Sequence, residues 1–422
     1  MRGACDVVIV GGGVAGLWSA VELGRGGVGF GVVLVEAGEL GGAQTIASQG
    51  IIHGGIKYAL GESVGDASRV IAGMPARWRA SLRGEVAPDL RGVRVLSESQ
   101  VLWTRPGIAS RVAGVAASAV IRTEVKRLGR EDVAGALAGA PRGRWGGGGI
   151  DVYRVDEQVL EPRSLVAALA ARAREARVRL VRGEMVEVEQ GGTSGARVRM
   201  TVRGAMMEIE ASAVVLAAGA GNEALVAGAW RESTAAAQLR PLHMVMARAA
   251  RGEAELPEVW GHCIGSSSLP LLTISSQRGG DGRVVWYMGG ALAEEGVARS
   301  EAEQRKAALA AIRACLPWLR LERLELATLR IDRAEARTGD GRRPEGPVVV
   351  RVGNVIAAWP TKLAFAPVVA DRVMEEVRAI VGAGGGRGGA ASGVGVSLPA
   401  DLPEPEVAPL PWDREGVEWS GA

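Results

Sequence analysis

The stretch that decides the fold is CDVVIVGGGVAGLWSAVEL, which occupies residues 5–23. The apolar run at 5–10 predicts a buried strand, and the helical character of 14–23 predicts a helix directly after it. A second apolar run, GVVLVE at 31–36, predicts the next strand. The order strand, helix, strand is typical of a parallel βαβ unit, with the glycines of this chain at the strand-to-helix turn.

The glycines of this turn are spaced as G-x-G-x-x-G, at Gly11, Gly13 and Gly16. In a dinucleotide site the first glycine permits the turn, the second lets the backbone approach a pyrophosphate, and the third allows close helix-strand packing. The helix N-terminus then faces the anion. Glu36 ends the second strand, where a carboxylate can accept hydrogen bonds from an adenosine ribose. This context predicts dinucleotide binding rather than a merely structural turn.

The composition excludes several other classes of protein. The chain has 422 residues, which is enough for two or three domains, and its net charge is +3 without any basic run. A dedicated nucleic-acid binder is therefore not expected. Cys5, Cys263 and Cys315 lie far apart without CxxC spacing, which argues against a disulfide framework or a zinc site. No apolar stretch reaches the roughly 20 residues of a membrane span, and no signal peptide is evident. We expect a cytoplasmic protein and leave open a peripheral contact with the inner membrane.

Four segments resemble a known family: 7–16, IIHGGIKY at 51–58, AVVLAAGAG at 213–221, and the late strand-helix at 355–369. They look like the FAD-dependent oxidoreductases of the D-amino-acid oxidase and glycerol-3-phosphate dehydrogenase superfamily. The closest likeness is to FAD-dependent glycerol-3-phosphate dehydrogenase, whose pattern S-S-K-L-I-H-G-G-L-R-Y-L is similar to SQGIIHGGIKYA at 48–59. L-2-hydroxyglutarate oxidases have a related H-A-G-x-Y-Y segment. The resemblance implies FAD as the cofactor.

The resemblance also implies a catalytic set. His243 resembles the histidine of the family's K-G-S-H strand, which lies over the substrate, and we expect it to act as the base. Arg330 resembles the arginine of G-V-R-P, which binds the substrate's anionic group. Lys57 and Tyr58 follow the H-G-G segment near flavin and substrate. Lys362 resembles the lysine of G-G-K-L-T, and at the start of the last helix it is placed to stabilise a reduced, anionic flavin.

Several of these residues have other interpretations. His243 lies in a strand-like run and could be a core histidine. Arg333 competes with Arg330 for the anion, and either could form a surface ion pair. His53 is expected near the flavin, with a loop hydrogen bond or covalent attachment to the flavin as alternatives. The adjacent His262 and Cys263 lack further ligands, so no metal site is expected.

The residues predicted to contact the cofactor extend along the motif segments. They are Gly11, Gly13, Val14, Ala15, Gly16, Glu36, Ala37, Thr45, Ser48, His53, Gly54, Val186, Ala218, Gly219, Thr361, Lys362 and Leu363.

The expected fold is α/β, with a discontinuous chain path. A Rossmann-type FAD-binding domain is assembled from 1–60, 150–225 and 330–385. It is interleaved with a substrate domain, dominated by an antiparallel sheet, at 61–149 and 226–329. A Gly- and Pro-rich tail at 386–422 is expected to be a linker or a segment laid over the surface.

The expected function is an FAD-dependent dehydrogenase or oxidase acting on a small anionic hydroxy or amino substrate. By resemblance, glycerol 3-phosphate is the leading candidate, and an L-2-hydroxy acid or an amino acid is the alternative. A third interpretation is a flavin-binding subunit without turnover, whose tail docks a partner through Trp412 and Trp419. The electron acceptor stays open among a quinone, oxygen and a partner protein.

Overall fold

The strand, helix and strand at the start of the chain form the centre of a parallel sheet. They are β1 (Arg2–Val10), α1 (Val14–Arg25) and β2 (Val32–Glu36). β1 pairs in parallel with β2 on one side and with β11 (Ala205–Leu216) on the other. This arrangement confirms the predicted βαβ unit.

The computed structural model describes most of the chain. The described residues are 1–25, 29–54, 66–105, 125–129, 131–141, 149–190, 195–230, 237–265, 267, 269–321, 323–383 and 395–421.

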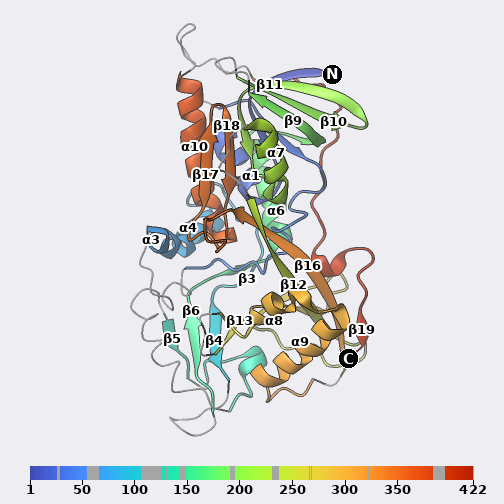
Figure 1. Cartoon of the computed structure of the whole chain (residues 1–422). Helices are drawn as coiled ribbons and strands as arrows, with labels where there is room; N and C mark the ends of the chain where they lie inside the picture. Colours follow the sequence, from blue (N-terminus) through green and yellow to red (C-terminus); the bar gives the residue numbers. More distant parts are fainter. Residues whose placement is uncertain are drawn as a thin grey trace.

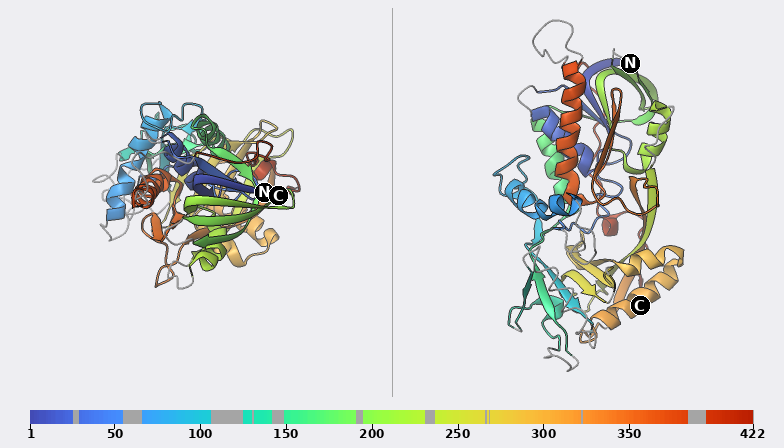
Figure 2. Two further views of the ribbon diagram at one scale, coloured as in Figure 1. Left: turned by 90° about the horizontal axis from the view of Figure 1, so that it is seen from above. Right: turned by 60° about the vertical axis from the view of Figure 1, so that its left-hand side comes forward.

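The first sheet is a layered unit in the upper half of Figure 1. Its main path runs β17, β18, β11, β1, β2, β8, and β9 and β10 extend it from β11. The further strands are β8 (Arg179–Arg182), β9 (Glu184–Gln190), β10 (Ala196–Val202), β17 (Val348–Val352) and β18 (Val355–Trp359). The helices α1, α6 (Pro162–Glu175) and α10 (Ala366–Ala383) pack together, and α10 stands along the sheet in Figure 2.

Both faces of this sheet are covered around β1 and β2, which explains why residues 7–10 and 32–35 are continuously apolar. Val7 and Ile9 point to the helices, whereas Val8 and Val10 pack against the antiparallel strands β9 to β11. All four side chains are almost completely buried. The alternation along β1 therefore builds two cores from one strand.

The second sheet has nine strands and fills the lower half of Figure 1. Its neighbours are antiparallel except for the parallel pair of β13 and β4. In spatial order the strands are β19 (Ser420–Gly421), β16 (Leu324–Ala336), β12 (Ala237–Ala249), β15 (Val284–Gly289), β14 (Leu272–Arg278), β13 (Trp260–Ile264), β4 (Gln100–Thr104), β6 (Val152–Val155) and β5 (Val125–Arg127).

The smaller elements lie around the two sheets. The helices are α3 (Asp66–Ala72), α4 (Met74–Leu82), α7 (Asn222–Ala229), α8 (Ala291–Glu295) and α9 (Glu301–Cys315). The 3-10 turns are η1 (Gly135–Leu137), η3 (Gly219–Gly221), η4 (Gly296–Ala298), η5 (Leu363–Phe365) and η6 (Pro411–Asp413), and β3 (Val95–Ser97) pairs with β7 (Val159–Leu160). α9 begins with a capping box, in which Ser300 and Glu303 each bind the other's backbone N–H.

The predicted α/β fold is confirmed: the first sheet is parallel from β18 to β8 and carries the antiparallel strands β17, β9 and β10, and the second sheet is mainly antiparallel. The structure corrects two details of the chain path. β6 belongs to the second sheet although it falls in the predicted FAD-binding segment 150–225, and β16 runs through the predicted boundary at residue 330.

The tail also differs from a linker. Its described part, 395–421, pairs with both sheets, and Trp412 is 4% exposed against Tyr287. The predicted docking role of Trp412 is therefore wrong, because a buried indole is not available to a partner. Arg248 stacks on Trp419, with 3.8 Å between its guanidinium carbon and the ring centroid.

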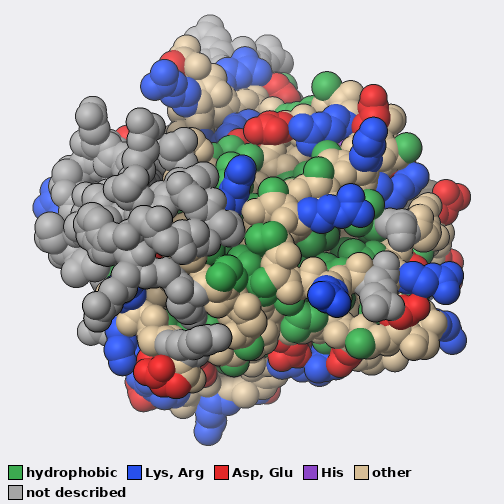
Figure 3. All heavy atoms as spheres, turned by 90° about the horizontal axis from the view of Figure 1, so that it is seen from below, with side chains coloured by type: hydrophobic (Ala, Val, Ile, Leu, Met, Phe, Trp, Pro, Cys, Tyr) green, Lys and Arg blue, Asp and Glu red, His purple; other side chains and the backbone are tan. Residues whose placement is uncertain are grey.

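Two further observations concern the surface and the sulfur atoms. On the face seen from below in Figure 3, arginines and acidic side chains are interspersed among apolar ones. The three cysteines are buried, and none forms a disulfide.

Among the described helices, none has the length and apolar character that crossing a bilayer requires.

Candidate cofactor and substrate site

A cavity of about 820 Å³ is lined by residues of both sheets. Its walls come from the turn after β1, the end of β2, the segment 38–53, the strands β12 and β16, and the segment 358–363. This volume lies in the range of cavities that enclose cofactors or small ligands. The loops at the carboxyl ends of β1 and β2 form one part of it, as expected for a doubly wound sheet.

The glycine turn shapes the cavity wall beside α1. Gly11 has φ 108°, and a Cβ atom there would lie 2.5 Å from the carbonyl oxygen of Ala217. At Gly16 a Cβ atom would lie 1.9 Å from the oxygen of Gly11, so only glycine lets α1 approach β1 so closely. A Cβ atom at Gly13 would meet only Thr45 Oγ1, at 3.3 Å, so backbone and helix N-terminus are open to an anion.

Glu36 is held in place at the end of β2. Its Oε2 accepts a hydrogen bond from the N–H of Gly12 at 2.7 Å, and its Oε1 accepts one from Gly38 at 2.9 Å. A carboxylate has about four acceptor positions, so two remain for ribose hydroxyls. Arg182, the last residue of β8 and the neighbour of Glu36 in the sheet, lines the same end of the cavity.

The segment after β2 connects the glycine turn to the second sheet. Thr45 Oγ1 accepts from the N–H of Val14 at 3.1 Å. Further along, Gln49 donates to the oxygen of Tyr287 at 2.9 Å, and its own carbonyl accepts from Ser275 Oγ at 2.9 Å. These bonds fix the floor of the cavity between the two sheets.

His53 lies at the cavity with a buried carboxylate behind it. Its Nδ1 is 3.3 Å from Glu157 Oε2, and Glu157 also accepts from the N–H of Gly54 at 2.5 Å and from Gln100 at 2.9 Å. His262 stacks beside His53 with 6.0 Å between the ring centroids. Within the described part of the chain, no group of three or more possible ligands surrounds a metal position.

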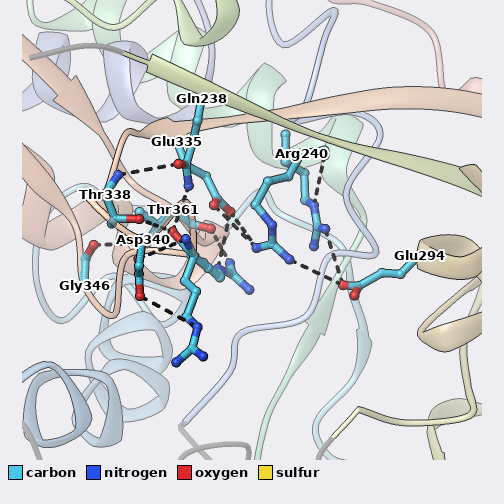
Figure 4. A network of polar contacts seen from close by, with 11 residues as sticks. Gln238, Arg240, Glu294, Glu335, Thr338, Asp340, Gly346 and Thr361 are labelled. Carbon is cyan, nitrogen blue, oxygen red and sulfur yellow. Dashed lines mark hydrogen bonds and ion pairs between the residues drawn. The ribbon is translucent and has the colours of Figure 1, made fainter.

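An arginine cluster borders the cavity where β12 and β16 pair (Figure 4). Arg333 and Arg240 both approach Glu294 Oε1, at 3.3 and 3.8 Å. Arg240 and Arg343 approach Glu335, a carboxylate that is 1% exposed, at 3.4 Å each. Burial lowers the pKa of Arg333, and the neighbouring Arg240 lowers it further. Three guanidinium groups thus share two carboxylates in this cluster.

The segment before α10 closes the other wall. Thr361 has φ 57°, and its carbonyl accepts a hydrogen bond from Arg343. Thr361, Lys362 and Leu363 all line the cavity, directly before the N-terminal end of η5 and α10. A cation and a helix N-terminus therefore lie at the same point, as predicted for Lys362.

Most of the predicted cofactor contacts come together in this cavity. Those that line it are Gly11, Gly13, Val14, Ala15, Glu36, Thr45, Ser48, His53, Ala218, Gly219, Thr361, Lys362 and Leu363. Gly16, Ala37 and Gly54 lie next to lining residues without lining the cavity themselves. Lys57 and Tyr58 lie outside the described residues.

Val186 is a wrong prediction. It lies on β9 with 55% of its surface exposed, away from the cavity. The residue near this point of the chain that does line the cavity is Arg182, at the end of β8.

His243 does not reach the cavity either. Its neighbours Leu242 and Met244 line the cavity, so the alternation of β12 turns His243 to the opposite face. The ring is 0% exposed, and its Nδ1 lies 3.0 Å from the oxygen of Gly296. Burial lowers the pKa of His243, which favours the neutral ring. The predicted base is therefore a core histidine.

Arg330 is corrected in favour of its competitor. Its guanidinium donates to the carbonyl oxygens of Val297, at 2.8 Å, and Arg299, at 2.5 Å, and it does not line the cavity. Arg333 does line it. The two arginines are three residues apart on one strand, so they point to opposite faces.

Sequence reasoning missed several contributors, among them Gln49, Glu157, Glu294 and Arg343. Gln49 stood inside the quoted H-G-G segment, so a signal was available for it. The others stand in no motif, and only the folded chain brings them to the cavity or behind it.

Comparisons with known proteins identify the family of this chain. Residues 6–396 match the model of the DAO family, described as FAD-dependent oxidoreductases. The chain therefore belongs to the DAO family of FAD-dependent oxidoreductases, and FAD is its cofactor.

One curated relative is similar along nearly the whole chain. It is the probable FAD-dependent oxidoreductase PA4991 of Pseudomonas aeruginosa, 41% identical over 409 residues, or 97% of each chain. Its crystal structure matches with a TM-score of 0.76 at 38% identity and 98% coverage of both chains.

More distant structures share the fold alone. Glycine oxidase of Geobacillus kaustophilus is 19% identical, with a TM-score of 0.64 and coverage of 89% of this chain and 95% of its own. The FAD-bound L-alpha-glycerophosphate oxidase of Mycoplasma pneumoniae is 14% identical, with a TM-score of 0.62 and the same coverages. The likeness to glycerol-3-phosphate enzymes is thus distant.

Proposed function

We propose that this oxidoreductase oxidises a small amine or alcohol that carries a single carboxylate next to the reacting carbon. The observation that carries the proposal is that Arg333 and His53 line one cavity with the FAD-binding glycine turn. One supplies positive charge for the carboxylate, and the other a ring nitrogen for the proton of the amine or hydroxyl. FAD, when bound, supplies the acceptor for the hydrogen and two electrons of the substrate carbon.

The charge of the arginine cluster supports one anionic group. In this cluster Arg240, Arg333 and Arg343 share the two carboxylates Glu294 and Glu335. Because Arg333 is partly desolvated, a carboxylate at its planar donor edge would gain a charge-assisted hydrogen bond. Arg333 would hold and orient the substrate in this way.

The second group supports the removal of a proton. Glu157 is almost fully buried and is positioned by two other donors, Gly54 and Gln100, so it holds the Nδ1 side of His53. The imidazole of His53 would then accept the proton of the substrate's heteroatom. This pairing assigns to His53 the base role that the sequence gave to His243.

Glycerol 3-phosphate, the candidate that the H-G-G segment favoured, is the second candidate. The observation in its favour is that His53 of this segment lines the cavity. Arg333, the guanidinium of the cluster that lines the cavity, offers one planar donor edge, which matches the two oxygens of a carboxylate. We therefore rank amino acids and 2-hydroxy acids first.

The test is anaerobic reduction of the bound flavin, followed by its absorbance. The holoprotein is mixed in turn with glycine, other amino acids and their N-methyl derivatives, L-2-hydroxy acids and glycerol 3-phosphate. Bleaching by an amino or hydroxy acid supports the proposal, whereas bleaching by glycerol 3-phosphate alone would overturn the ranking. A flavin that none of these compounds reduces would favour the flavin-binding subunit without turnover.

A further inference from the structure

The C-terminal segment 395–421, here called the strap, runs from the first sheet past the cavity to the second sheet (Figure 1, dark red). It begins with a bridge between Ser397 and Ala4 of β1. It ends in β19, where Ser420 pairs with Leu326 of β16. The two sheets that form the cavity are thus joined by one further stretch of chain.

The strap binds the backbone of the segment that follows β2. The N–H of Leu40 donates to the oxygen of Glu406 at 2.7 Å, and the oxygen of Leu40 accepts from Ala408 at 3.1 Å. Arg414 donates to the oxygen of Gly42 at 2.8 Å. Next to this segment, the N–H of Arg182 donates to the oxygen of Pro403 at 2.7 Å.

These contacts lie at the cofactor cavity. The cavity is lined by residues 38, 39, 41, 42 and 43 and by Glu36 and Arg182. It is also lined by Glu406, which belongs to the strap. This is the end of the cavity where Glu36 is placed for the ribose. The strap therefore supplies one residue that lines the cavity, and it also forms hydrogen bonds with the backbone of the loop that lines the cavity.

Its aromatic anchor holds the next part of the same loop. Trp412 packs edge-on against Tyr287, with 5.5 Å between ring centroids. The hydroxyl of Tyr287, which is completely buried, donates to the oxygen of Ala47 at 2.9 Å. Ala47 lines the cavity. The strap thus fixes the loop at Leu40, Gly42 and, through Tyr287, Ala47.

We propose that the strap is a part of the FAD site that orders the loop 38–47 around the adenosine-diphosphate half of the cofactor. The loop consists of turns. Without the strap it would lose conformational entropy when FAD binds and orders it, and this loss would weaken binding. A preformed loop removes that cost and raises affinity. Glu406 adds a hydrogen-bond acceptor at the rim of the adenosine end.

The test measures the affinity of the apoprotein for FAD in full-length variants. Arg414→Ala removes the bond to Gly42, and Glu406→Ala removes the acceptor at the rim. Glu404→Ala is the matched control, because Glu404 pairs with Arg174 of α6 at 3.0 Å and does not line the cavity. Quenching of flavin fluorescence gives the dissociation constant, and thermal melting of each apoprotein confirms that it is folded.

We expect Arg414→Ala to weaken FAD binding roughly 10-fold, as for the loss of a hydrogen bond from a charged donor. Glu406→Ala should weaken it about 3-fold, and Glu404→Ala should stay within about 2-fold of the unchanged chain. Competition by ADP should weaken by the same factors, because the contacts serve the adenosine-diphosphate half. An affinity for FAD in Arg414→Ala equal to that of the Glu404 variant would overturn the proposal, as would a loss for FAD without a loss for ADP.

Discussion

The Nδ1 atom of His53 lies 3.3 Å from Oε2 of Glu157, whose side chain is only 2% exposed. A buried carboxylate beside an imidazole orients the ring by holding one of its two nitrogen atoms. His53 also lines the cofactor cavity, so we propose this pair as an acid-base element of the site.

Replacing Glu157 by Gln should therefore slow flavin reduction by substrate. General-base catalysis contributes about 100- to 10,000-fold, and we expect the loss of the orienting carboxylate to remove about 10- to 100-fold of it. The rate of bleaching in an anaerobic stopped-flow experiment measures this effect. Asp156→Asn is the control, because Asp156 is the next residue and pairs with Arg79 instead. Equal rates in the two variants would remove Glu157 from the mechanism.

Arg333 and Arg330 allow a matched test of the anion site. Arg333→Met removes the cation that lines the cavity, whereas Arg330→Met removes one that binds the carbonyls of Val297 and Arg299. We expect kcat/KM to fall roughly 10- to 100-fold in the first variant, since charged hydrogen bonds contribute about 1.5–3 kcal/mol. In the second it should change less than about 3-fold. The opposite order would restore the prediction made from sequence.

The outcome for these arginines indicates how far sequence could lead. The glycine turn, β1 and β2 were predictable, because a continuous apolar run followed by glycines has few other uses. The face to which a strand residue points was not predictable. A shift of one residue along a strand turns every side chain to the other face of the sheet. The resemblance placed His243 and Arg330 on the face toward the cavity, whereas both lie on the opposite face.

Two other parts of the site needed the folded chain. Glu157 is a single acid in no motif, and it reaches His53 only because Gly54 and Gln100 bind it too. The tail was predicted to be a linker or a surface segment because it is rich in Gly and Pro. Its described part does run along both sheets as a surface segment, but the burial of Leu410 and Trp412 in the core around the cofactor loop was not predicted.

Gly13 and Gly16 should respond differently to substitution by Ala. At Gly16 the added Cβ atom would lie 1.9 Å from the backbone oxygen of Gly11, which can move only if β1 or α1 shifts. Gly16→Ala should therefore destabilise the fold by several kcal/mol. At Gly13 the nearest atom is 3.3 Å away, so Gly13→Ala should fold and bind FAD less tightly, because the methyl group occupies space for the pyrophosphate. Urea unfolding and flavin content measure the two effects. A Gly16→Ala protein as stable as the unchanged chain would contradict the predicted clash.

His243 should contribute to the loss of stability in acid. Burial lowers its pKa below the ordinary value of 6.5, so in the unfolded chain His243 takes up a proton at a higher pH than in the folded protein. When the pH falls from the ordinary pKa toward the lower pKa of the folded protein, the unfolded state binds more protons than the folded state. The free energy of unfolding therefore decreases. A His243→Gln variant lacks this uptake. The decrease in its urea midpoint between about pH 7.5 and 5.5 should therefore be smaller than in the unchanged chain. An equal decrease in both proteins would show that His243 has the same pKa in the folded and the unfolded state.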